Sequence, residues 1–412
     1  MKRALLLIFA LMLTAGLVIT GCEKKAEEKE AAGSEMKTEE HKGSEAKADM
    51  PSGEPIRIGG LFAVTGPASS LGLPEKQTVE MLEEQINNEG GIMGRPLEVI
   101  IYDTEGEESK TVNFAKRLIE NDKVVAVLGS TRSGPSMAIV DTFTNAQIPL
   151  VSCAASYKIV KDDEGNARKW IFKTPQSDSM AVEKIYEHMN ANDISKIAIM
   201  SVSNGYGDSG RAELLRLAEN YGIEVLADER FGQDDVDMTA QLTKIKGSDA
   251  QALVVWAVQK APAIVAKNAK TLGVEIQIYQ SHGVASKKFI ELCGDAADGQ
   301  LLPSGRLLVV DQLPESDPQK AVLAEYKQNF EERYGPVSTF GGHAYDALML
   351  TKLAIENSGS TEPAKIRDAL EGIDRFVGTG GIFNMSPADH NGLDKDAFVM
   401  VEIVNQDWKL VE

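Results

Sequence analysis

Apolar residues recur along most of this chain in two alternating patterns. Nearly continuous apolar runs such as "PIRIGGLFAV" (55–64) predict strands that are buried on both faces. The stretch 75–91 instead carries Val79, Leu82 and Ile86 at helical spacing, which predicts an amphipathic helix. Because strands that alternate with crossover helices pair in parallel, the pattern predicts an α/β fold with helices on both faces of each sheet.

The same alternation continues through the rest of the chain. Strands are predicted at 55–64, 95–105, 124–130, 148–152, 196–203, 223–231, 252–258 and 276–281. Helices are predicted at 75–91, 110–122 (capped by Ser109), 135–146, 179–191, 208–221, 238–246 and 262–272. A further series of predicted elements begins at "GRLLVVD" (305–311) and includes helices near 319–333 and 340–357. The alternation of strands and helices begins again after "FKTPQSD" (172–178), and we therefore predict two Rossmann-like parallel-sheet lobes. In such folds a ligand binds at the carboxyl ends of the strands, so we expect it between the two lobes.

The N-terminal residues follow a different pattern. Lys2 and Arg3 precede an uncharged apolar segment, 4–19, which is short for a membrane span of about 20 residues. Small residues then follow in "LVITGC", which resembles the lipobox of bacterial lipoproteins. We therefore expect a removed signal peptide at 1–21 and a lipid on Cys22. The alternative is an ordinary cleavage site beside an unrelated cysteine.

Residues 22–54 are predicted to form a disordered, charged linker. Glu, Lys, Ala, Ser and Gly dominate this segment, which has almost no bulky apolar side chain with which to form a core. From residue 55 onward the chain is long enough for two lobes with substantial cores. The sequence thus predicts a globular body tethered to a membrane.

Composition argues against several classes of function. A formal net charge of −19 would repel the phosphates of nucleic acid. Cys153 and Cys293 are far apart and predict no disulfide framework, and the five histidines lack the spacing of metal ligands, so we expect no cofactor and no metal. An enzyme would have to use Ser133 or Cys153 as nucleophile and His282 as base. The chain has no G-x-S-x-G elbow, and we expect no enzyme.

Four segments, in order along the chain, point to a known group of proteins. They are "IRIGGLFAVTGPASSLG", "INNEGGIMGRPLEVIIYDTEGEESKTVNFAKRLIENDKVVAVLGSTRSGPSMAIV", "IPLVSCAAS" and "NGYGDSG". Together they resemble the leucine/isoleucine/valine-binding family, the solute receptors of ABC importers, and the likeness extends over 55–412. The resemblance implies two lobes joined by three hinge crossovers that close over one small ligand. It places 55–174 and 306–384 in lobe one, and 175–305 and 385–412 in lobe two.

Two of the predicted strand ends carry groups that could bind an anion. "GSTRSGPS" and "VSCAAS" each lead into a predicted helix start, where free N–H groups and the helix dipole attract negative charge. Ser133 and Ser156 add hydroxyl groups, and the small Ala154 allows a carboxylate to approach the backbone. The resemblance implies that these three residues bind the carboxylate of the ligand. The alternative is that the two serines only cap helices.

Two further residues are candidates for contacts with the rest of the ligand. Tyr206 lies in "NGYGDSG", where Gly205 and Gly207 leave the backbone free to present the ring when the lobes close. The resemblance implies that Leu71 contacts the apolar part of the ligand. The alternatives are a half-buried loop tyrosine and an ordinary core leucine.

The chain departs from the amino-acid binders of the family in three places. His282, in "YQSHGVAS", stands where those relatives carry a carboxylate that pairs with the ligand's ammonium group. Val258 and Gln259 stand in place of an aromatic residue, and Arg132 in place of a disulfide cysteine. Because an imidazole binds ammonium less strongly than a carboxylate does, these changes favour an anion over a zwitterion. The alternative is that His282 merely packs in a loop.

The sequence as a whole predicts a monomeric, lipid-anchored solute receptor on the extracytoplasmic face of a membrane. It would bind a small carboxylate-bearing ligand, an amino acid or a related acid, and deliver it to the permease subunits of an ABC importer. One alternative is a receptor for aromatic or aliphatic carboxylates or amides that lack an α-ammonium group. Another is a ligand-sensing subunit of a signalling system.

Overall fold

The computed structural model describes residues 50–411. The predicted signal peptide, the lipid attachment site Cys22 and most of the predicted linker lie outside the described residues. At the end of that linker, the backbone N–H of Ser52 donates to the carbonyl oxygen of Gly94 over 2.9 Å, so this part lies against the body. In the described range, no helix has the length and apolar character needed to cross a membrane.

Five parallel strands form the first sheet, in the order β2-β1-β3-β4-β5. Their bounds are β1 (Ile56–Phe62), β2 (Leu97–Asp103), β3 (Ala126–Gly129), β4 (Leu150–Ser152) and β5 (Ile171–Lys173). Ile58 of β1 pairs with Val99 on one side and with Ala126 on the other, which fixes the register of the sheet. The first four of these strands along the chain were predicted, each a few residues too long, whereas β5 was not predicted.

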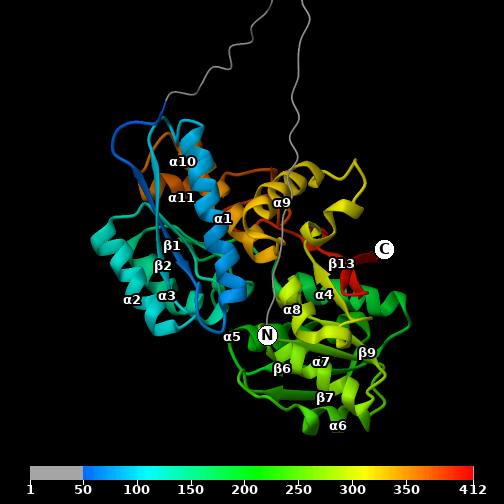
Figure 1. The fold of residues 1–412 in the computed structure, drawn as a ribbon. Coiled ribbons are helices and arrows are strands. Elements are labelled where there is room, and N and C mark those ends of the chain that lie inside the picture. The colour runs from blue at the N-terminus through cyan, green and yellow to red at the C-terminus, as the bar shows by residue number, and fades with distance from the viewer. Residues whose placement is uncertain (1–49, 412) are drawn as a thin grey trace, which may run out of the picture. The chain divides into compact units, whose positions relative to one another are not determined.

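Helices cover both faces of the first sheet (Figure 1). They are α1 (Ser69–Asn88), α10 (Thr339–Ser358) and α11 (Pro363–Glu371) on one face, and α2 (Glu108–Arg117) and α3 (Ser133–Ala146) on the other. Ile58 and Phe62 of β1 belong to the core under α1 and α10, whereas Leu61 belongs to the core under α2 and α3. This follows from the alternation of side chains along a strand.

The second sheet has seven strands, in the order β14-β13-β10-β9-β8-β6-β7. Their bounds are β6 (Lys196–Val202), β7 (Glu224–Phe231), β8 (Ala252–Trp256), β9 (Gln277–Gln280), β10 (Leu301–Ser304), β13 (Val399–Val404) and β14 (Asp407–Val411). The strands from β10 to β7 are parallel, and β13 runs antiparallel to both β10 and β14. The α/β fold with two parallel-sheet lobes is therefore confirmed, with an antiparallel hairpin added at one edge.

The second sheet is also covered on both faces. Its helices are α4 (Asp178–Ala191) and α5 (Gly205–Ala218) on one face, and α6 (Thr239–Lys246) and α7 (Ala261–Leu272) on the other, with α8 (Lys287–Cys293) and α9 (Lys320–Tyr334) nearby. Ile199 of β6 packs into the core under α4 and α5, and its neighbour Met200 packs into the core under α6 and α7. We call the first sheet with its helices the first lobe, and the second sheet with its helices the second lobe.

Within residues 50–411 the chain passes between the two sheets three times. It leaves the first sheet after β5, returns to it after β10 through a 3-10 helix (Arg306–Gln312), α9 and α10, and comes back to the second sheet at β13. A two-stranded hairpin, β11 (Phe376–Val377) with β12 (Ile382–Phe383), precedes the last passage. The residue limits assigned to the lobes from the sequence stay a prediction.

Two local predictions are wrong. The first helix begins at Ser69 rather than 75, because Gly72 lets it approach the backbone of Ala63, whose oxygen would lie 2.4 Å from a Cβ there. Ser109 lies inside α2, which follows Glu107 as its cap residue. The segment 305–311, for which the sequence predicted no type of element, lies largely in a 3-10 helix (Arg306–Gln312).

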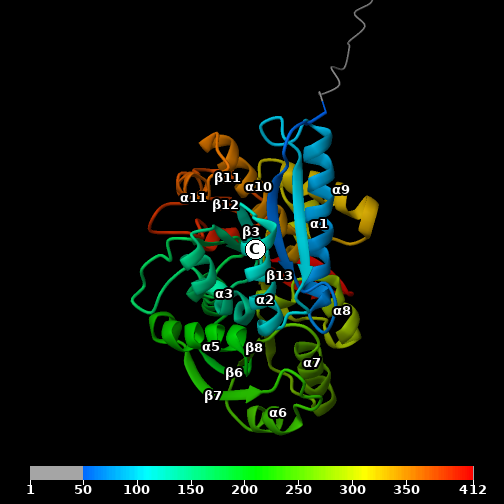
Figure 2. The same cartoon turned by 90° about the vertical axis from the view of Figure 1, so that its left-hand side faces the viewer.

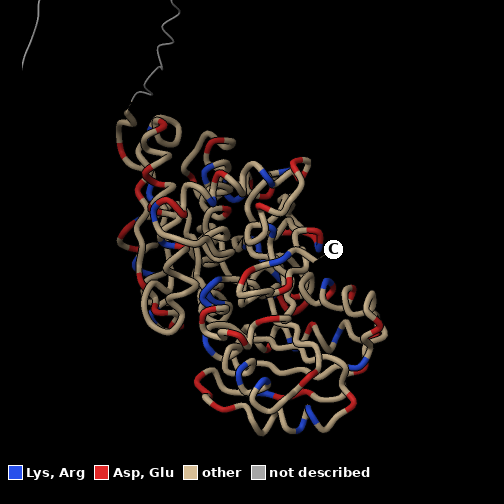
Figure 3. Tube along the Cα trace, turned by 45° about the vertical axis from the view of Figure 1, so that its right-hand side comes forward, with Lys and Arg blue, Asp and Glu red and all other residues tan. Residues whose placement is uncertain are grey.

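Charged residues of both signs are distributed along the whole trace (Figure 3). Many Lys and Arg side chains pair with carboxylates, as Arg211 does with Asp228 and Arg306 with Asp317.

Candidate functional site

A cavity lies between the lobes, at the carboxyl ends of strands from both sheets. Its walls are formed by Leu71, Thr131, Arg132, Ser133, Cys153, Ala154, Ala155, Pro175, Tyr206, Val258, His282, Gly283, Phe340 and His343. The empty space among these residues, including the part open to solvent, is about 450 Å³. The centre of a water-sized sphere has only about 40 Å³ available there, so the cavity is narrow in this arrangement of the lobes.

Most of the predicted ligand-binding residues meet at this cavity. Those that line it are Leu71, Ser133, Ala154, Tyr206 and His282. The remaining one, Ser156, lies next to it: its backbone N–H donates to the Oγ atom of Ser133 over 3.4 Å, and its own Oγ lies 2.9 Å from that of Ser209. The structure thus brings the predicted residues together, and their contacts with a ligand stay a prediction.

The two serines do not act as helix caps. Ser133 is the first residue of α3, whose cap residue is Arg132, and its side chain accepts no capping hydrogen bond. Ser156 precedes only a three-residue 3-10 helix (Tyr157–Ile159), again without a capping bond from its hydroxyl. Neither hydroxyl makes a capping hydrogen bond, although Ser156 occupies the cap position of that short helix, and the expectation of a full helix start after "VSCAAS" is wrong.

Tyr206 is fixed within the second lobe by two sets of hydrogen bonds. The side chain of Asn204 caps α5 and accepts from the backbone N–H groups of Tyr206 and Gly207, each over 3.1 Å. The tyrosine hydroxyl accepts from the N–H of Gly283 over 3.0 Å. A side chain at position 283 would clash, since a Cβ there would lie 2.7 Å from this hydroxyl. These contacts hold the ring of Tyr206 in the cavity wall, and its contact with a ligand when the lobes close stays a prediction.

His282 lies in an aromatic enclosure. Its ring is 5.7 Å from those of Tyr206 and Trp256 and 5.4 Å from that of Phe398, measured between centroids. Neither of its ring nitrogens has a hydrogen-bond partner among the described residues. Burial lowers the pKa of His282 to about 3, so the imidazole is neutral at physiological pH. His282 is thus buried at the cavity wall, and its two ring nitrogens form no hydrogen bond with the described residues.

A buried carboxylate and a buried ammonium lie behind His282. Asp178, the first residue of α4, places Oδ1 3.8 Å from Nε2 of His282. Lys173, at the end of β5, donates to the carbonyl oxygen of Pro175 and, over 3.2 Å, to Oδ1 of Asn391. Burial raises the pKa of Asp178 and lowers that of Lys173, and each charge partly offsets the desolvation of the other. This pair lies where the chain crosses between the sheets.

Sequence reasoning missed His343 and Phe340, which line the cavity from α10. Burial lowers the pKa of His343 to about 3, and its Nδ1 has no hydrogen-bond partner among the described residues. Its backbone oxygen accepts a hydrogen bond from Thr174 in the first crossover, over 2.8 Å. The segment "TFGGHAYDAL" reads as an ordinary buried helix, and nothing in its spacing marks one histidine as part of a site.

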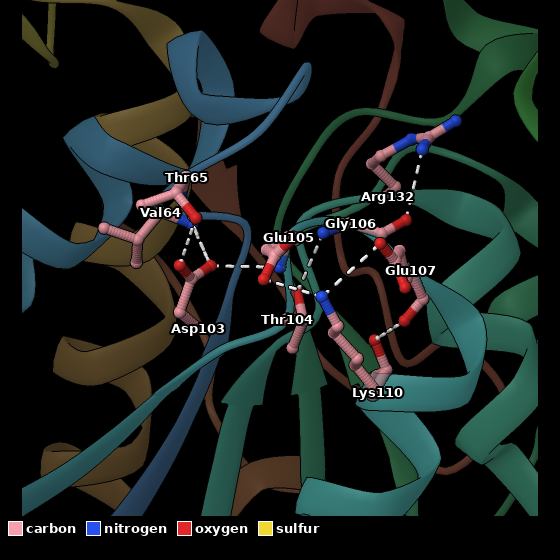
Figure 4. Close-up of polar contacts among 10 residues, drawn as sticks. Val64, Thr65, Asp103, Thr104, Glu105, Gly106, Glu107, Lys110 and Arg132 are labelled. Carbon is pink, nitrogen blue, oxygen red and sulfur yellow. Dashed lines mark hydrogen bonds and ion pairs between the residues drawn. The ribbon is translucent and has the colours of Figure 1, made fainter.

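Arg132 lines the cavity, and Figure 4 shows its side chain beside the loop that contains Gly106. Its guanidinium donates to the carbonyl oxygen of Gly106 over 3.1 Å and, across to the second lobe, to Oε1 of Gln233 over 2.6 Å. The loop that contains Gly106 is held by Asp103, whose Oδ1 accepts from the backbone N–H groups of Val64, Thr65 and Glu105. In the same loop, Glu105 and Glu107 form ion pairs with Lys110.

Among the described residues, no group of three His, Cys, Asp or Glu side chains is placed to hold a metal ion.

The two lobes touch at the rim of the cavity. Figure 2 shows α3 lying above α5, and a Cβ on Gly205 would be 3.3 Å from the Cα of Gly134. The Ser156–Ser209 contact and the Arg132–Gln233 hydrogen bond also join one lobe to the other. The cavity is therefore enclosed by contacts that would separate if the lobes moved apart.

The neutral histidines predict a dependence of stability on pH. Because their folded pKa of about 3 lies below the ordinary value of 6.5, the unfolded chain binds more protons in this window, and stability falls as the pH is lowered through it. The variant His343→Gln removes one titrating group, so between pH 6.5 and 4.5 its unfolding free energy should fall by about 2 kcal/mol less than that of the wild type.

Urea unfolding at several pH values measures this difference. Asp178 and Lys173 face His282 and titrate in both proteins, so their contributions cancel in the comparison. Parallel stability curves for the two proteins would show that His343 is not buried in its neutral form.

Comparisons with known proteins agree with this architecture. A family model described as "Periplasmic binding protein" matches residues 55–406. The leucine-, isoleucine-, valine-, threonine-, and alanine-binding protein of Pseudomonas aeruginosa is 26% identical over 317 residues, which cover 76% of this chain and 82% of that protein. An extracellular ligand-binding receptor from Rhodopseudomonas palustris HaA2 superposes with a TM-score of 0.81 at 26% identity, over 87% of this chain and 100% of that one. The substrate binding protein LivJ of a branched-chain amino acid transporter from Streptococcus pneumoniae, in complex with isoleucine, gives 0.76 at 26% identity, over 87% and 99%.

Proposed function

The chain belongs to the leucine/isoleucine/valine-binding branch of the periplasmic binding protein family, and we propose that it is a lipid-anchored receptor that delivers a small carboxylate-bearing solute to an ABC importer. The family consists of solute-binding receptors rather than enzymes, and it is extracytoplasmic. Attachment through Cys22, the importer as partner and the monomeric state are parts of the proposal.

The observation that carries the proposal is the composition of the cavity wall. Arg132 is the one Lys or Arg side chain among the described residues that line the cavity, and none of them is Asp or Glu. Among the lining residues, an anion therefore meets one cation and no carboxylate; the nearest carboxylates, Glu75 and Asp178, contact the lining residues Thr131 and His282 from behind. Ser133 supplies a hydroxyl group and Leu71 an apolar surface in the same space, as a small organic acid requires.

The strength of such a site suits a receptor. A hydrogen bond to a charged group contributes about 1.5–3 kcal/mol, and three or four of them with apolar burial give micromolar affinity or better after the cost of association. The relatives supply the biological context: the Pseudomonas aeruginosa protein is named for the five amino acids that it binds, and LivJ was crystallised with isoleucine. We take from them the class of solute, an amino acid or a related acid.

A thermal-shift screen of amino acids against aromatic and aliphatic carboxylates tests the proposal directly. A ligand at a hundredfold excess over its dissociation constant stabilises the folded state by about 2.7 kcal/mol, which gives a clear rise in the melting temperature. If no compound of either class raises it, the protein is not a receptor for small carboxylates.

The variant Ser133→Ala tests the location of the site. With the carboxylate that gives the largest shift, calorimetry should show a loss of affinity of about ten- to a hundredfold, because one charge-assisted hydrogen bond is removed. The free protein should stay folded, with a small fall in its melting temperature because the backbone N–H of Ser156 loses its acceptor, a long contact of 3.4 Å. Ser195→Ala, an exposed position at the opposite end of β6, is the matched control and should bind as the wild type does. Equal affinities for the two variants would place the ligand elsewhere.

A further inference from the structure

One side chain, that of Gln233, joins loops from both lobes at the rim of the cavity. Its Oε1 accepts from Nη2 of Arg132 over 2.6 Å and from Nδ2 of Asn204 over 3.1 Å, and its Nε2 donates to Oε1 of Gln259 over 3.3 Å. Arg132 follows β3 in the first lobe, whereas the other three residues follow β6, β7 and β8 in the second. The contact between Arg132 and Gln233 can therefore exist only while the lobes are together.

The second lobe holds Gln233 in position by itself. Asn204 caps α5, and its Oδ1 accepts from the backbone N–H of Tyr206 over 3.1 Å. The same amide group donates through Nδ2 to Gln233, and Gln259 accepts from the other end of the Gln233 amide. The acceptor oxygen that Arg132 meets is therefore placed by residues of the second lobe alone.

The guanidinium of Arg132 has hydrogen-bond acceptors but no counter-ion. Its two contacts are with neutral oxygens, the carbonyl of Gly106 (Figure 4) and the amide of Gln233. Among the described residues, no carboxylate forms an ion pair with it, and the two that act on it from a distance, Glu108 and Asp234, are exposed to solvent. Burial lowers the pKa of Arg132 by more than these exposed carboxylates raise it. The protein thus leaves this charge without a close negative partner.

Closure of the lobes encloses this guanidinium, which is half-buried at the rim. Because removing an unpaired charge from water costs free energy, Arg132 opposes closure of an empty cavity. A negatively charged group in the cavity offsets that cost. A guanidinium has more N–H donors than its two contacts use, and the unused Nε is not among the fully buried polar atoms. Since Arg132 lines the cavity, an anion there can bind to it while Gln233 holds it.

We propose that Arg132 and Gln233 form a latch that closes on the carboxylate of the solute: the negative charge offsets the desolvation of Arg132, and Gln233 then holds the guanidinium across the rim. The proposal rests on the proposed function and names what controls closure of the same site. Gln233 is a positioning residue, since it acts on the solute through Arg132. A solute of the same shape without the carboxylate charge leaves Arg132 without a counter-ion and does not favour the closed arrangement.

The variant Gln233→Glu tests the latch without any solute, on the full chain. A carboxylate at this position meets Arg132 across the rim and supplies the counter-ion that the wild-type protein lacks. In a buffer free of small carboxylates, small-angle scattering should give this variant a smaller radius of gyration than the wild type. Gln241→Glu is the matched control, since Gln241 is a half-buried glutamine on α6 whose amide donates within the second lobe, and it should scatter as the wild type does. Equal radii for Gln233→Glu and the wild type would overturn the latch.

Pairs of acids and amides test the dependence on charge. The pairs are leucine with leucinamide, 4-methylpentanoate with 4-methylpentanamide, and 3-phenylpropanoate with 3-phenylpropanamide, so that only the carboxylate changes within a pair. The acid should bind the wild type at least about tenfold more tightly than its amide and should alone reduce the radius of gyration. An equal reduction by the amide would overturn the latch. Failure of every acid, together with an empty thermal-shift screen, would overturn the receptor for carboxylates, whereas the scattering of solute-free Gln233→Glu decides the latch in either case.

The variant Gln233→Leu tests the latch through rates of binding. Because the contact with Arg132 forms only after the lobes have met, its loss should raise the dissociation rate of the tightest-binding acid of these pairs by about tenfold or more. The association rate should change by less than about threefold. Stopped-flow fluorescence measures both rates, and Gln241→Leu should leave both as in the wild type. An unchanged dissociation rate in Gln233→Leu would overturn the latch, as would an effect of the same size in Gln241→Leu.

Discussion

Replacement of Gly205 by leucine should weaken ligand binding by about ten- to a hundredfold without unfolding the protein. Gly205 begins α5 and meets Gly134 of α3 across the rim of the cavity, where even a Cβ would be 3.3 Å from the opposing backbone. A leucine side chain needs space that the start of α3 occupies when the lobes are together. Overpacking of this kind costs about 1–3 kcal/mol, and here the cost falls on the closed arrangement alone.

Two measurements check the effect of Gly205→Leu. Calorimetry with the best carboxylate from the screen gives the loss of affinity, and small-angle scattering gives the radius of gyration, which should be larger than that of the wild type with ligand. Gly247→Leu, at an exposed position after α6 in the same lobe, is the control. Wild-type affinity in Gly205→Leu would mean that the ligand binds without the contact between α3 and α5.

Much of the fold could be predicted because strands and helices alternate with strong apolar patterns. The strand 252–258 was predicted close to its true bounds, since every residue of β8 is buried and the run is continuous. The two-residue strands of the β11–β12 hairpin could not be found, because they are too short to have a period. The predicted helix starts at 75, although Gly72 and Pro74 already lie within α1, because the sequence does not reveal that the helix packs a glycine against Ala63.

The site was predicted where strand ends carry polar or small residues, and missed where helices contribute. Ser133, Ala154 and His282 follow strands and therefore collect at the sheet edges. His343 comes from the middle of a buried helical segment, and Asp178 occupies the first position of α4, where a carboxylate is ordinary. Neither residue has a local signal, and their relation to the cavity depends on how the chain crosses between the lobes.

Asp346 carries the largest expected effect on stability. It lies on α10 and is fully buried. Its carboxylate accepts hydrogen bonds from the backbone N–H groups of Thr379 and Gly380, over 2.6 and 2.7 Å, and from the hydroxyl of Thr379 over 3.1 Å. The carbonyl oxygen of Gly380 in turn accepts from the side chain of Gln176 in the first crossover, over 2.6 Å. One carboxylate thus holds the β11–β12 turn against both α10 and the crossover.

The variant Asp346→Ala should lower the free energy of unfolding by about 3–5 kcal/mol, because three buried donors lose their acceptor at once. Urea unfolding measures the change. Asp346→Asn keeps one acceptor oxygen and should lose clearly less, while Asp141→Ala, at an exposed position on α3, should stay within about 0.5 kcal/mol of the wild type. A loss below about 1 kcal/mol in Asp346→Ala would mean that water replaces the carboxylate, and that the turn beside the crossover is held by its backbone contacts instead.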